Sequence, residues 1–447
     1  MKIHLKHFVL IGLAAWLGGA ASGADSAWKA GIARVKITPD EPIWMAGYAS
    51  RDKPSEGVRH DLFAKALALE DGSGKPAVLV TLDLVGIEKE MGDVIAARCL
   101  KEHGLARDRL LFNISHTHSG PVAGLSLMPL YKLTPEQRDV VRRYTEGLIN
   151  KVVGVVGASL QNLAPAKLEF KQSLAGFGAN RRRASNRFLP GPVDHDVPVL
   201  KISDAAGTLR AVVVGYACHA TCLGDFQING DWPGYAQEEI EKAHPGATAF
   251  FVQGCGADIN PLPRRTVELA VKYGQILAAA VEEVLGRPMT SLAGPMTTAF
   301  ECVDVAFQTP PTREELEARL KDKNVHRQNH ARQMLDLLDH GGKLPASYPY
   351  PIQVWQFGPK LKLIALAGEV VVDYSLRLKT QHGWDTTWVA GYCNDILAYI
   401  PSLRVLREGG YEGGDAMIYF GRPAPFSEAV EETIIEKTAQ LVKRTTP

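Results

Sequence analysis

The sequence predicts an α/β protein in which layered mixed β-sheets are flanked by helices. Three observations indicate this class. Short apolar runs rich in Val, Leu, Ile and Phe recur along the chain, longer segments with helical spacing of apolar residues follow several of them, and the alternation continues almost to the C-terminus. With 447 residues, of which 46% are hydrophobic and 22% charged, the chain can bury the core that such layers need.

Five continuous apolar runs are predicted to be buried strands, because they are short and contain few charges. They are residues 77–87, 109–114, 197–202, 209–217 and 247–252. Four longer segments are predicted to be helices from their apolar spacing. They are residues 88–103, 134–160, 266–285 and 427–443. Thr134 and Pro135 are typical of a helix start, and Gly104 is typical of a helix end.

Residues 310–351 differ from the rest of the chain. Residues 312–340 form a highly charged helical stretch with a modest apolar stripe, and glycines and prolines follow it. We interpret this region as an insertion that packs on the surface. Its charges are typical of a solvated helix, and a position over a functional site is the alternative.

The N-terminus carries a targeting signal. Lys2 and Lys6 precede an apolar run at residues 8–17, and small residues follow it through Ala24. This pattern predicts a secretory signal peptide at residues 1–24 and an exported protein, periplasmic or secreted, with one domain over residues 25–447. The run is too short to be favoured as a membrane anchor.

Charge and cysteine content limit the function classes. Lys and Arg number 50 and Asp and Glu 49, so no basic field extends over the chain to hold nucleic acid or an anionic bilayer. The six cysteines are too sparse for a disulfide scaffold, and Cys218 and Cys222 lack the spacing of a zinc–thiolate site. We expect buried thiols, with at most one bridge.

The first motif with chemical content is residues 113–121, Asn-Ile-Ser-His-Thr-His-Ser-Gly-Pro. A predicted strand delivers His116 and His118 two residues apart, and Gly-Pro then turns the chain. In an extended segment residues i and i+2 point to the same side, so both imidazoles are expected to face one pocket. This suits one zinc ligand and one neighbour that stabilises charge, although a structural histidine pair gives the same pattern.

Two further strands end in polar motifs. Residues 209–217 lead into Cys-His-Ala-Thr, which contains His219, and residues 229–235 are expected to form a tight turn before a helix at residues 236–242. Residues 250–261 end in Gln-Gly-Cys-Gly-Ala-Asp-Ile-Asn-Pro, whose glycines permit close approach of the backbone to a ligand. Three strands with such endings predict a site at one edge of the sheet.

These three motifs, in this order, resemble the catalytic domain of the neutral (non-lysosomal) ceramidases. Residues 366–369, Leu-Ala-Gly-Glu, look like the Gly-Glu ligand loop of that family, and residues 391–413 look like its tyrosine segment. The resemblance runs from about residue 31 to about residue 421. It implies the catalytic-domain fold of that family and a hydrolase of N-acyl amide bonds.

The resemblance also implies roles for single residues. It places the zinc ligands at His116, His219, Glu369 and Tyr399. His118 and Tyr411 match the pair that stabilises the developing oxyanion, and Arg181 matches an arginine in the substrate pocket. With Arg181 we group Asp231 as a substrate-binding residue.

The chain departs from the family pattern at two places. Asn260 stands where the family has a serine near the attacking water, and an amide can orient water but cannot form an acyl-enzyme. We expect Asn260 and Asp258 to act in catalysis, with Asp258, Asp231 or Glu369 as proton acceptor. The family continues into a β-rich domain beyond the position of Pro447, so ceramide itself is not favoured as substrate, and hydrolysis of some amide, ester or lactone is expected.

The sequence therefore predicts a zinc-dependent amidohydrolase in which a metal-activated water attacks a small or lipid-like acyl substrate. Two alternatives stay open. One is a zinc esterase or lactonase that acts on a small soluble metabolite through the same residues. The other is a catalytically inactive metal-binding homologue, which the asparagine at position 260 favours. Oligomeric state is not predicted.

Overall fold

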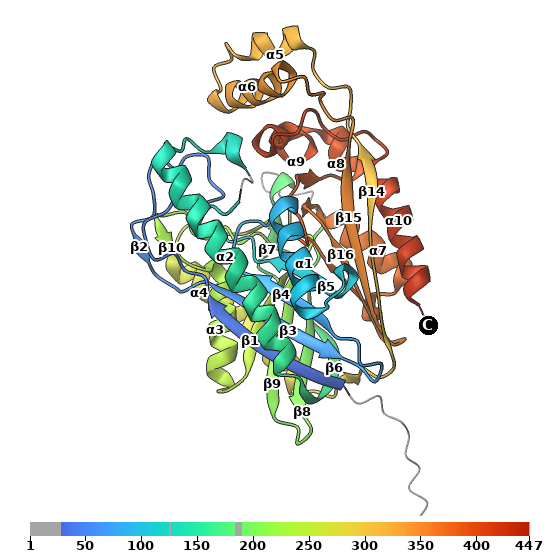
Figure 1. The fold of residues 1–447 in the computed structure, drawn as a ribbon. Helices are drawn as coiled ribbons and strands as arrows, with labels where there is room; N and C mark the ends of the chain where they lie inside the picture. Colours follow the sequence, from blue (N-terminus) through green and yellow to red (C-terminus); the bar gives the residue numbers. More distant parts are fainter. Residues whose placement is uncertain (1–27, 125–126, 184–189, 447) are drawn as a thin grey trace, which may run out of the picture.

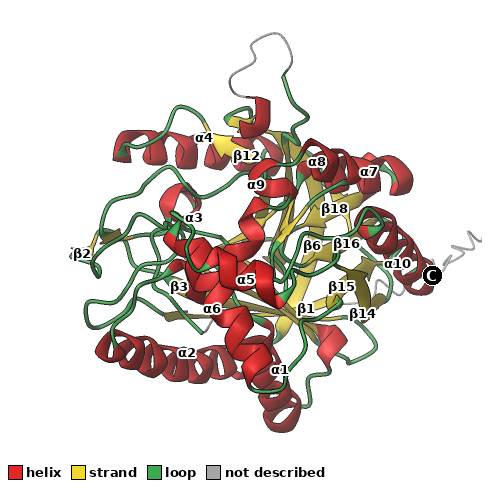
Figure 2. Cartoon of the chain, turned by 90° about the horizontal axis from the view of Figure 1, so that it is seen from above, coloured by secondary structure: helices red, strands yellow, loops and turns green. Residues whose placement is uncertain are grey.

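Two stacked β-sheets, each covered by helices on its outer face, form the architecture of the chain (Figures 1 and 2). The computed structural model describes residues 28–124, 127–183 and 190–446. The predicted signal peptide at residues 1–24 lies outside the described residues. The prediction of an α/β protein with layered mixed sheets between helices is confirmed.

Among the described residues, nine strands form the larger sheet, in the order β11-β9-β8-β6-β1-β3-β4-β5 with β13 beside β6. The pairs β4–β5 and β9–β11 are parallel and the other pairs are antiparallel. The strands are β1 (Trp28–Lys36), β3 (Phe63–Glu70), β4 (Ala77–Leu82), β5 (Leu110–Ile114), β6 (Ala164–Leu174), β8 (Asp196–Asp204), β9 (Leu209–Tyr216), β11 (Thr248–Gln253) and β13 (Thr290–Ser291).

The second sheet packs on one face of the first. In the described part of the chain its order is β14-β15-β16-β18, with bounds β14 (Met296–Ala306), β15 (Ser347–Phe357), β16 (Leu361–Leu366) and β18 (Thr387–Ala390). Trp355, Phe357 and Trp388 from this sheet lie in one buried cluster with Leu79 and Val213 of the larger sheet. Burial of these large side chains holds the two sheets together.

Helices cover the outer faces (Figure 1). On the larger sheet α1 and α2 pack over β3, β4 and β5, and α3 and α4 pack over β8, β9 and β11. On the second sheet α7 and α10 form the outer layer. The helices are α1 (Lys89–His103), α2 (Pro135–Gln161), α3 (Asp231–Ala243), α4 (Val267–Leu285), α7 (Val372–His382) and α10 (Val430–Thr445).

The helix boundaries follow the capping signals in the sequence. Thr134 accepts a hydrogen bond from the backbone N–H of Gln137 in a capping box, and Gly104 ends α1 in a left-handed conformation with φ 68°. The expected turn at residues 229–235 is wrong, because α3 begins at Asp231. The Asp231 carboxylate accepts the N–H of Trp232, and Pro233 lies in the first helical turn, where a missing N–H donor is tolerated.

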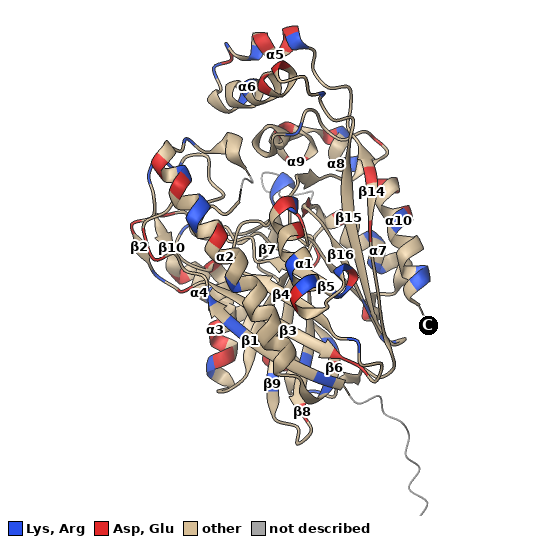
Figure 3. Ribbon diagram, viewed as in Figure 1, with Lys and Arg blue, Asp and Glu red and all other residues tan. Residues whose placement is uncertain are grey.

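The charged insertion consists of two helices, where the sequence suggested one stretch. They are α5 (Arg313–Arg319) and α6 (Val325–Asp339), and Asn324 caps the second by accepting the N–H of His326. Both lie over the end of the molecule that carries α8 (Leu403–Glu408) and α9 (Gly410–Gly413) (Figures 1 and 2). Both acidic and basic residues lie along them (Figure 3).

Short elements form the loops at this end. The two-stranded pairs in the described chain are β2 (Gly57–Val58) with β10 (Gln227–Ile228), β7 (Gly178–Asn180) with β12 (Ile259–Pro261), and β17 (Glu369–Val370) with β19 (Tyr399–Ile400). The 3-10 turns are η1 (Arg107–Arg109), η2 (Met128–Leu130), η3 (Arg181–Arg183), η4 (Trp384–Thr386) and η5 (Asp415–Phe420).

The two edge strands of the larger sheet, β5 and β11, are brought together by the buried side chain of Asn113. Its amide N–H group donates to the carbonyls of Gly391 at 2.9 Å and Gln253 at 3.3 Å, and its carbonyl accepts the N–H of Gln253 at 2.7 Å. The twist of the sheet carries these edges toward each other. The loops after β5 and β11 are therefore neighbours.

All six cysteines lie in the described residues and are free thiols. Five are buried, as expected, and Cys302 is exposed. The alternative of one disulfide bridge is wrong. Within the described residues no helix combines the length and apolar character needed to cross a membrane.

Replacing Asn113 with alanine is expected to lower the free energy of unfolding by roughly 2–3 kcal/mol, because the N–H of Gln253 and the carbonyl of Gly391 would lose a buried partner. Urea unfolding measures this change. The control is Asn150→Ala on the exposed face of α2, with an expected change of about 0.5 kcal/mol or less. Equal effects of the two substitutions would contradict the role of Asn113.

Candidate metal centre and active site

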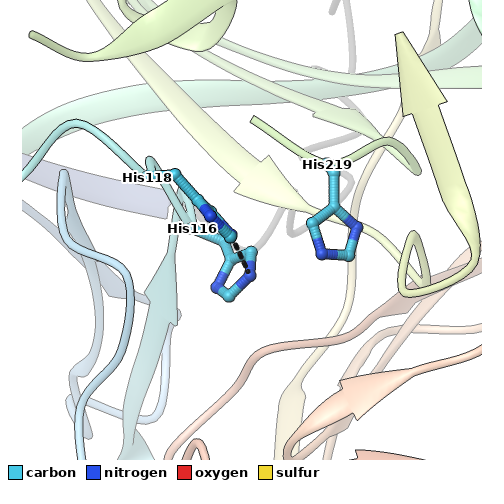
Figure 4. A group of neighbouring side chains, drawn as sticks. All are labelled: His116, His118 and His219. Atoms are coloured by element: carbon cyan, nitrogen blue, oxygen red, sulfur yellow. Dashed lines mark hydrogen bonds between the residues drawn. The ribbon is translucent and has the colours of Figure 1, made fainter. Parts of the chain in front are cut away.

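Four chain segments bring the proposed metal ligands together. His116 follows β5, His219 follows β9, and Figure 4 shows their rings, with that of His118, turned toward one another. Glu369 and Tyr399 begin the short strands β17 and β19, and the parallel pairing of those strands places the two residues opposite each other. All four residues are almost completely buried.

His116 has a backbone φ of 56°, in the left-handed region. The expected extended conformation of residues 116–118 is therefore wrong. The two imidazoles still face one pocket, and their Nε2 atoms are 3.0 Å apart. A left-handed histidine is strained, and such strain persists where surrounding contacts impose it. One such contact is the carbonyl of Val85, which lies 2.6 Å from Nδ1 of His116.

Backbone carbonyls fix the tautomers of both histidine ligands. Nδ1 of His219 lies 2.7 Å from the carbonyl of Gly256, as Nδ1 of His116 lies against Val85. A carbonyl can only accept, so each Nδ1 carries the proton and each Nε2 presents a lone pair. Gly256 has no room for a side chain, because a Cβ there would lie 2.6 Å from the backbone nitrogen of Cys218. This arrangement is typical of histidines that bind a metal.

The spacing of the donor atoms fits a tetrahedral metal ion. Oε2 of Glu369 is 3.3 Å from Nε2 of His116 and 3.1 Å from Nε2 of His219, and Oη of Tyr399 is 3.3 Å from Nε2 of His219. A tetrahedral zinc site with bonds of about 2.0 Å has donor–donor separations of about 3.3 Å. Two imidazoles, a carboxylate and a phenol oxygen also suit zinc chemically.

His118 is a second candidate for this donor set, because ligand atoms of His116, His118 and His219 all lie within 4.8 Å of one another. Its ring packs against Tyr48, with centroids 4.8 Å apart, and its Nδ1 is buried without a hydrogen-bond partner. Gly47 makes space for this ring, since a Cβ on Gly47 would lie 2.5 Å from it.

Burial keeps the imidazoles of His118 and His219 neutral. It lowers the pKa of His219 to about 4, with a further contribution from Arg181, and it lowers the pKa of His118 well below its usual value, with help from His116. Burial alone would raise the pKa of Glu369, but the neighbouring imidazoles of His116 and His219 hold it well below the ordinary value. The imidazoles of His118 and His219 are therefore neutral and the carboxylate of Glu369 is ionised, the protonation states that bind metal.

Arg181 lies beside the centre but its charge is already paired. Its Nε donates to Glu412 at 2.6 Å, one Nη donates to Tyr399 at 3.1 Å, and the other lies 3.5 Å from Oδ1 of Asn260. Burial alone would lower the pKa of Arg181, but Tyr399 and Glu412 hold it well above the ordinary value. Arg181 thus orients Tyr399 and Asn260, and Glu412 neutralises it.

Asp231 and Asp258 use both carboxylate oxygens to hold the loops around the centre. Asp231 accepts the N–H groups of Cys222 and Leu223 at 3.1 and 2.8 Å. Asp258 accepts the N–H of Val372 and the amide of Asn180 at 2.9 and 2.8 Å. Burial raises the pKa of each aspartate to about 6. These contacts favour a positioning role for both over direct contact with substrate or water.

Asn260 and Tyr411 lie at different depths. Asn260 is buried in β12, with Oδ1 accepting the hydroxyl of Thr221 at 3.4 Å. Tyr411 is 45% exposed, and its ring lies 5.1 Å from that of Tyr399. Tyr411 thus stands at the open side of the centre, where a substrate can reach its hydroxyl.

Sequence reasoning missed four residues of this site: Tyr48, Thr221, Tyr392 and Glu412. The ring of Tyr392 lies 4.6 Å from that of His116, and its buried hydroxyl has no hydrogen-bond partner. Tyr392 and Glu412 both fall inside the tyrosine segment, 391–413, where they were overlooked beside Tyr399 and Tyr411. Thr221 ends the Cys-His-Ala-Thr motif at residues 218–221, where it was overlooked beside His219, and no sequence signal identifies Tyr48, which reaches the site through contacts between distant segments.

Comparisons with known proteins identify relatives of this chain. A family model described as neutral/alkaline non-lysosomal ceramidase, N-terminal, matches residues 28–261. Neutral ceramidase A of Dictyostelium discoideum is 26% identical over 265 residues, covering 54% of this chain and 37% of that protein. Neutral ceramidase of Drosophila melanogaster is 23% identical over 258 residues, covering 53% and 36%. The chain thus matches little more than a third of the length of these relatives.

The fold extends the similarity beyond the matched sequence. Neutral ceramidase from Pseudomonas aeruginosa gives a TM-score of 0.75 at 20% identity, covering 95% of this chain and 75% of that one. A ceramidase complexed with C2 gives a TM-score of 0.74 at 18% identity, covering 95% and 76%. The family model ends at Pro261, before Glu369 and Tyr399, whereas the shared fold covers nearly the whole chain.

Replacing His219 with alanine is expected to abolish stoichiometric zinc binding, because Nε2 of this residue is one of four closely spaced donors. Metal analysis after dialysis against buffered zinc measures the loss, and circular dichroism reports the fold. His340→Ala is the control, since His340 is exposed on α6's C-terminal side. Full zinc content in the His219 variant would exclude it as a ligand.

Proposed function

Because this chain belongs to the neutral/alkaline non-lysosomal ceramidase family, we propose that it is an exported zinc-dependent hydrolase that cleaves the amide bond of an N-acyl substrate. The observation that supports this most strongly is a set of four buried donor atoms from His116, His219, Glu369 and Tyr399. Three pairs of these atoms lie 3.1–3.3 Å apart. Such spacing is hard to explain by packing alone, because it gathers polar atoms in a buried place.

A zinc ion bound by these ligands would polarise the scissile carbonyl and lower the pKa of an attacking water. The residues of the chain supply the rest. His118, kept neutral by burial, and the phenol of Tyr411 donate hydrogen bonds to the oxygen on which negative charge develops. Arg181 donates to Tyr399 and so fixes the phenol oxygen beside Nε2 of His219.

Asn260 limits the mechanism to direct attack by water. An amide side chain forms no covalent acyl intermediate, so no residue at this position takes the substrate's acyl group. Its Oδ1 is held by the hydroxyl of Thr221 and faces Arg181. Asn260 is therefore proposed to orient the water or the amide nitrogen of the substrate, while Asp258 and Asp231 hold the loops that carry it.

The test is a panel of N-acyl amides, ceramide included, and matched esters of equal acyl length, assayed with and without a chelator. We expect the amides to be hydrolysed and the chelator to abolish the activity, which zinc then restores. Faster hydrolysis of the esters or of lactones would favour the esterase alternative. Bound zinc without turnover of any acyl substrate would identify a binding protein.

Gly47→Ala is expected to lower kcat by roughly tenfold or more while zinc stays bound, because the new Cβ would displace the ring of His118 from the oxyanion. Gly74→Ala is the matched control. Gly74 has a similar left-handed φ, 71° against 95°, but open space around its Cβ. The two variants bear the same kind of backbone strain, so comparable kcat values in both would contradict the role of His118.

A further inference from the structure

Four arginines gather on the side of the centre that faces Tyr48, Thr221 and Asn260. They are Arg51, Arg181, Arg264 and Arg265. The last two follow β12 directly, after the motif that contains Asn260. The ring of Tyr48 contacts His118 and also lies 4.9 Å from the guanidinium carbon of Arg51 and 5.1 Å from that of Arg265.

The protein itself holds two of these arginines in place. Arg51 is buried and donates to the backbone carbonyls of Ala46, His118 and Asp225 at 2.5, 2.7 and 3.0 Å. Arg181 is neutralised by Glu412. Neither guanidinium is free to take a new anion, so these two residues build the wall of the site.

Arg264 and Arg265 differ, because the described parts of the chain give them neither a carboxylate partner, as Arg181 has, nor the short backbone hydrogen bonds that hold Arg51. Nη1 of Arg264 makes a long contact, 3.5 Å, with the carbonyl of Thr221. Burial lowers the pKa of Arg264, and the neighbouring charge of Arg265 lowers it further, as expected for two adjacent cations without a counter-ion. The charge of Arg265 acts on the carboxylate of Asp231, which already accepts backbone N–H groups.

The backbone holds this pair of charges in place. Arg265 has a φ of 94°, which is unfavourable for a residue with a side chain, and its N–H donates to the carbonyl of Cys222 at 2.7 Å. Gly224 allows the guanidinium to come close, since a Cβ there would lie 2.4 Å from Nη1 of Arg265. Strained conformations of this kind concentrate at functional sites.

The contacts connect this pair to the reacting centre. Thr221 joins Arg264, through its carbonyl, to Asn260, through its hydroxyl, and Tyr48 joins Arg265 to His118. Both Asn260 and His118 are proposed to act on the scissile amide. An anionic group a few bonds from that amide would therefore meet two guanidinium groups that lack a partner.

We propose that Arg264 and Arg265 form an anion-binding subsite, and that the substrate is an N-acyl amide whose amine portion carries a carboxylate or sulfonate, such as an N-acyl amino acid. This substrate class rests on the proposed amidase function. Guanidinium groups match carboxylate and sulfonate oxygens in geometry and charge, and a neutral sphingoid or ethanolamine portion would leave both cations unpaired.

The activity test compares N-lauroylglycine with N-lauroylethanolamine, which share the acyl chain and differ in charge. The wild-type enzyme is expected to show a kcat/KM roughly tenfold higher for the glycine amide at low ionic strength, and the preference should shrink in about 0.5 M salt. The variant Arg264→Gln/Arg265→Gln is expected to lose roughly tenfold on the glycine amide and less than about threefold on the ethanolamide. The single variants should fall between.

Arg210→Gln is the control. Arg210 is exposed, forms no ion pair in the described chain, and lies at the opposite end of β9, roughly 30 Å of extended chain from His219. It is expected to leave both substrates unaffected. A wild-type enzyme that prefers the ethanolamide, or a double variant that slows both substrates equally, would overturn the subsite.

A binding measurement separates this inference from the amidase proposal. The metal-free wild-type protein, which cannot turn the amides over, is titrated with each amide by calorimetry. We expect tighter binding of N-lauroylglycine, by roughly tenfold, and loss of that difference in the double variant. If N-lauroylglycine binds more tightly as expected but the zinc enzyme hydrolyses no amide, the amidase proposal is wrong and the anion-binding subsite stands. If hydrolysis occurs and binding ignores charge, the subsite fails alone.

Discussion

The position of the proposed metal ligands depends on the contact between strands β5 and β11, which one buried amide makes. Asn113 lies three residues before His116, and its partner Gln253 lies three residues before Gly256, whose carbonyl holds the ring of His219. A sheet of this size would otherwise keep its edges apart. The amide of Asn113 offers both donors and an acceptor. It therefore takes the place of the backbone hydrogen bonds that β5 and β11 do not form with each other, next to the loops that carry the two histidines. The distance between two histidines about a hundred residues apart is thus set by a side chain that touches no metal.

Most strands that the sequence predicts are buried on both faces, but it does not predict every such strand: β3, β16 and β18 are missed. β4, β5, β9 and β11 are continuous apolar runs, and their predicted bounds differ from the observed ones by at most five residues. β1 and β6 alternate buried with exposed positions, so they contain no such run. β3 was not predicted for another reason: the charged Lys65 interrupts its apolar run. That ammonium is buried because it donates to Gln237, Glu241 and the carbonyl of Ala249, partners that lie more than 170 residues away.

The same division applies to the site. The sequence motifs were sufficient to select the residues that the fold brings together. Histidine, glutamate and tyrosine side chains that occur together at strand ends are typical of a metal site. Their local conformations were not predictable. The left-handed backbone of His116 accompanies a hydrogen bond to Val85, and the pairing of Arg181 with Glu412 joins segments 231 residues apart. Both are tertiary contacts without a local sequence signature, and the second changes what Arg181 can bind. A motif therefore identifies which residues belong to a site, but it does not predict whether the charge of such a residue is already neutralised by another part of the protein.

The insertion between β14 and β15 reaches the centre through aromatic rings. His326 of α6 packs on Tyr419 at 5.4 Å, Tyr419 lies 6.0 Å from Tyr411, and Tyr411 lies 5.1 Å from Tyr399. These rings contact the site at Tyr399, whereas Arg264 and Arg265 contact it at Thr221 and Tyr48. An amide with an apolar acyl chain and an anionic amine portion can satisfy both at once, with the chain against the rings and the charge against the guanidinium groups. The reverse orientation would place the charge against the aromatic faces, which repel anions. Both surfaces therefore favour the same orientation of the substrate, with its acyl chain against the aromatic rings and its charged amine portion against Arg264 and Arg265.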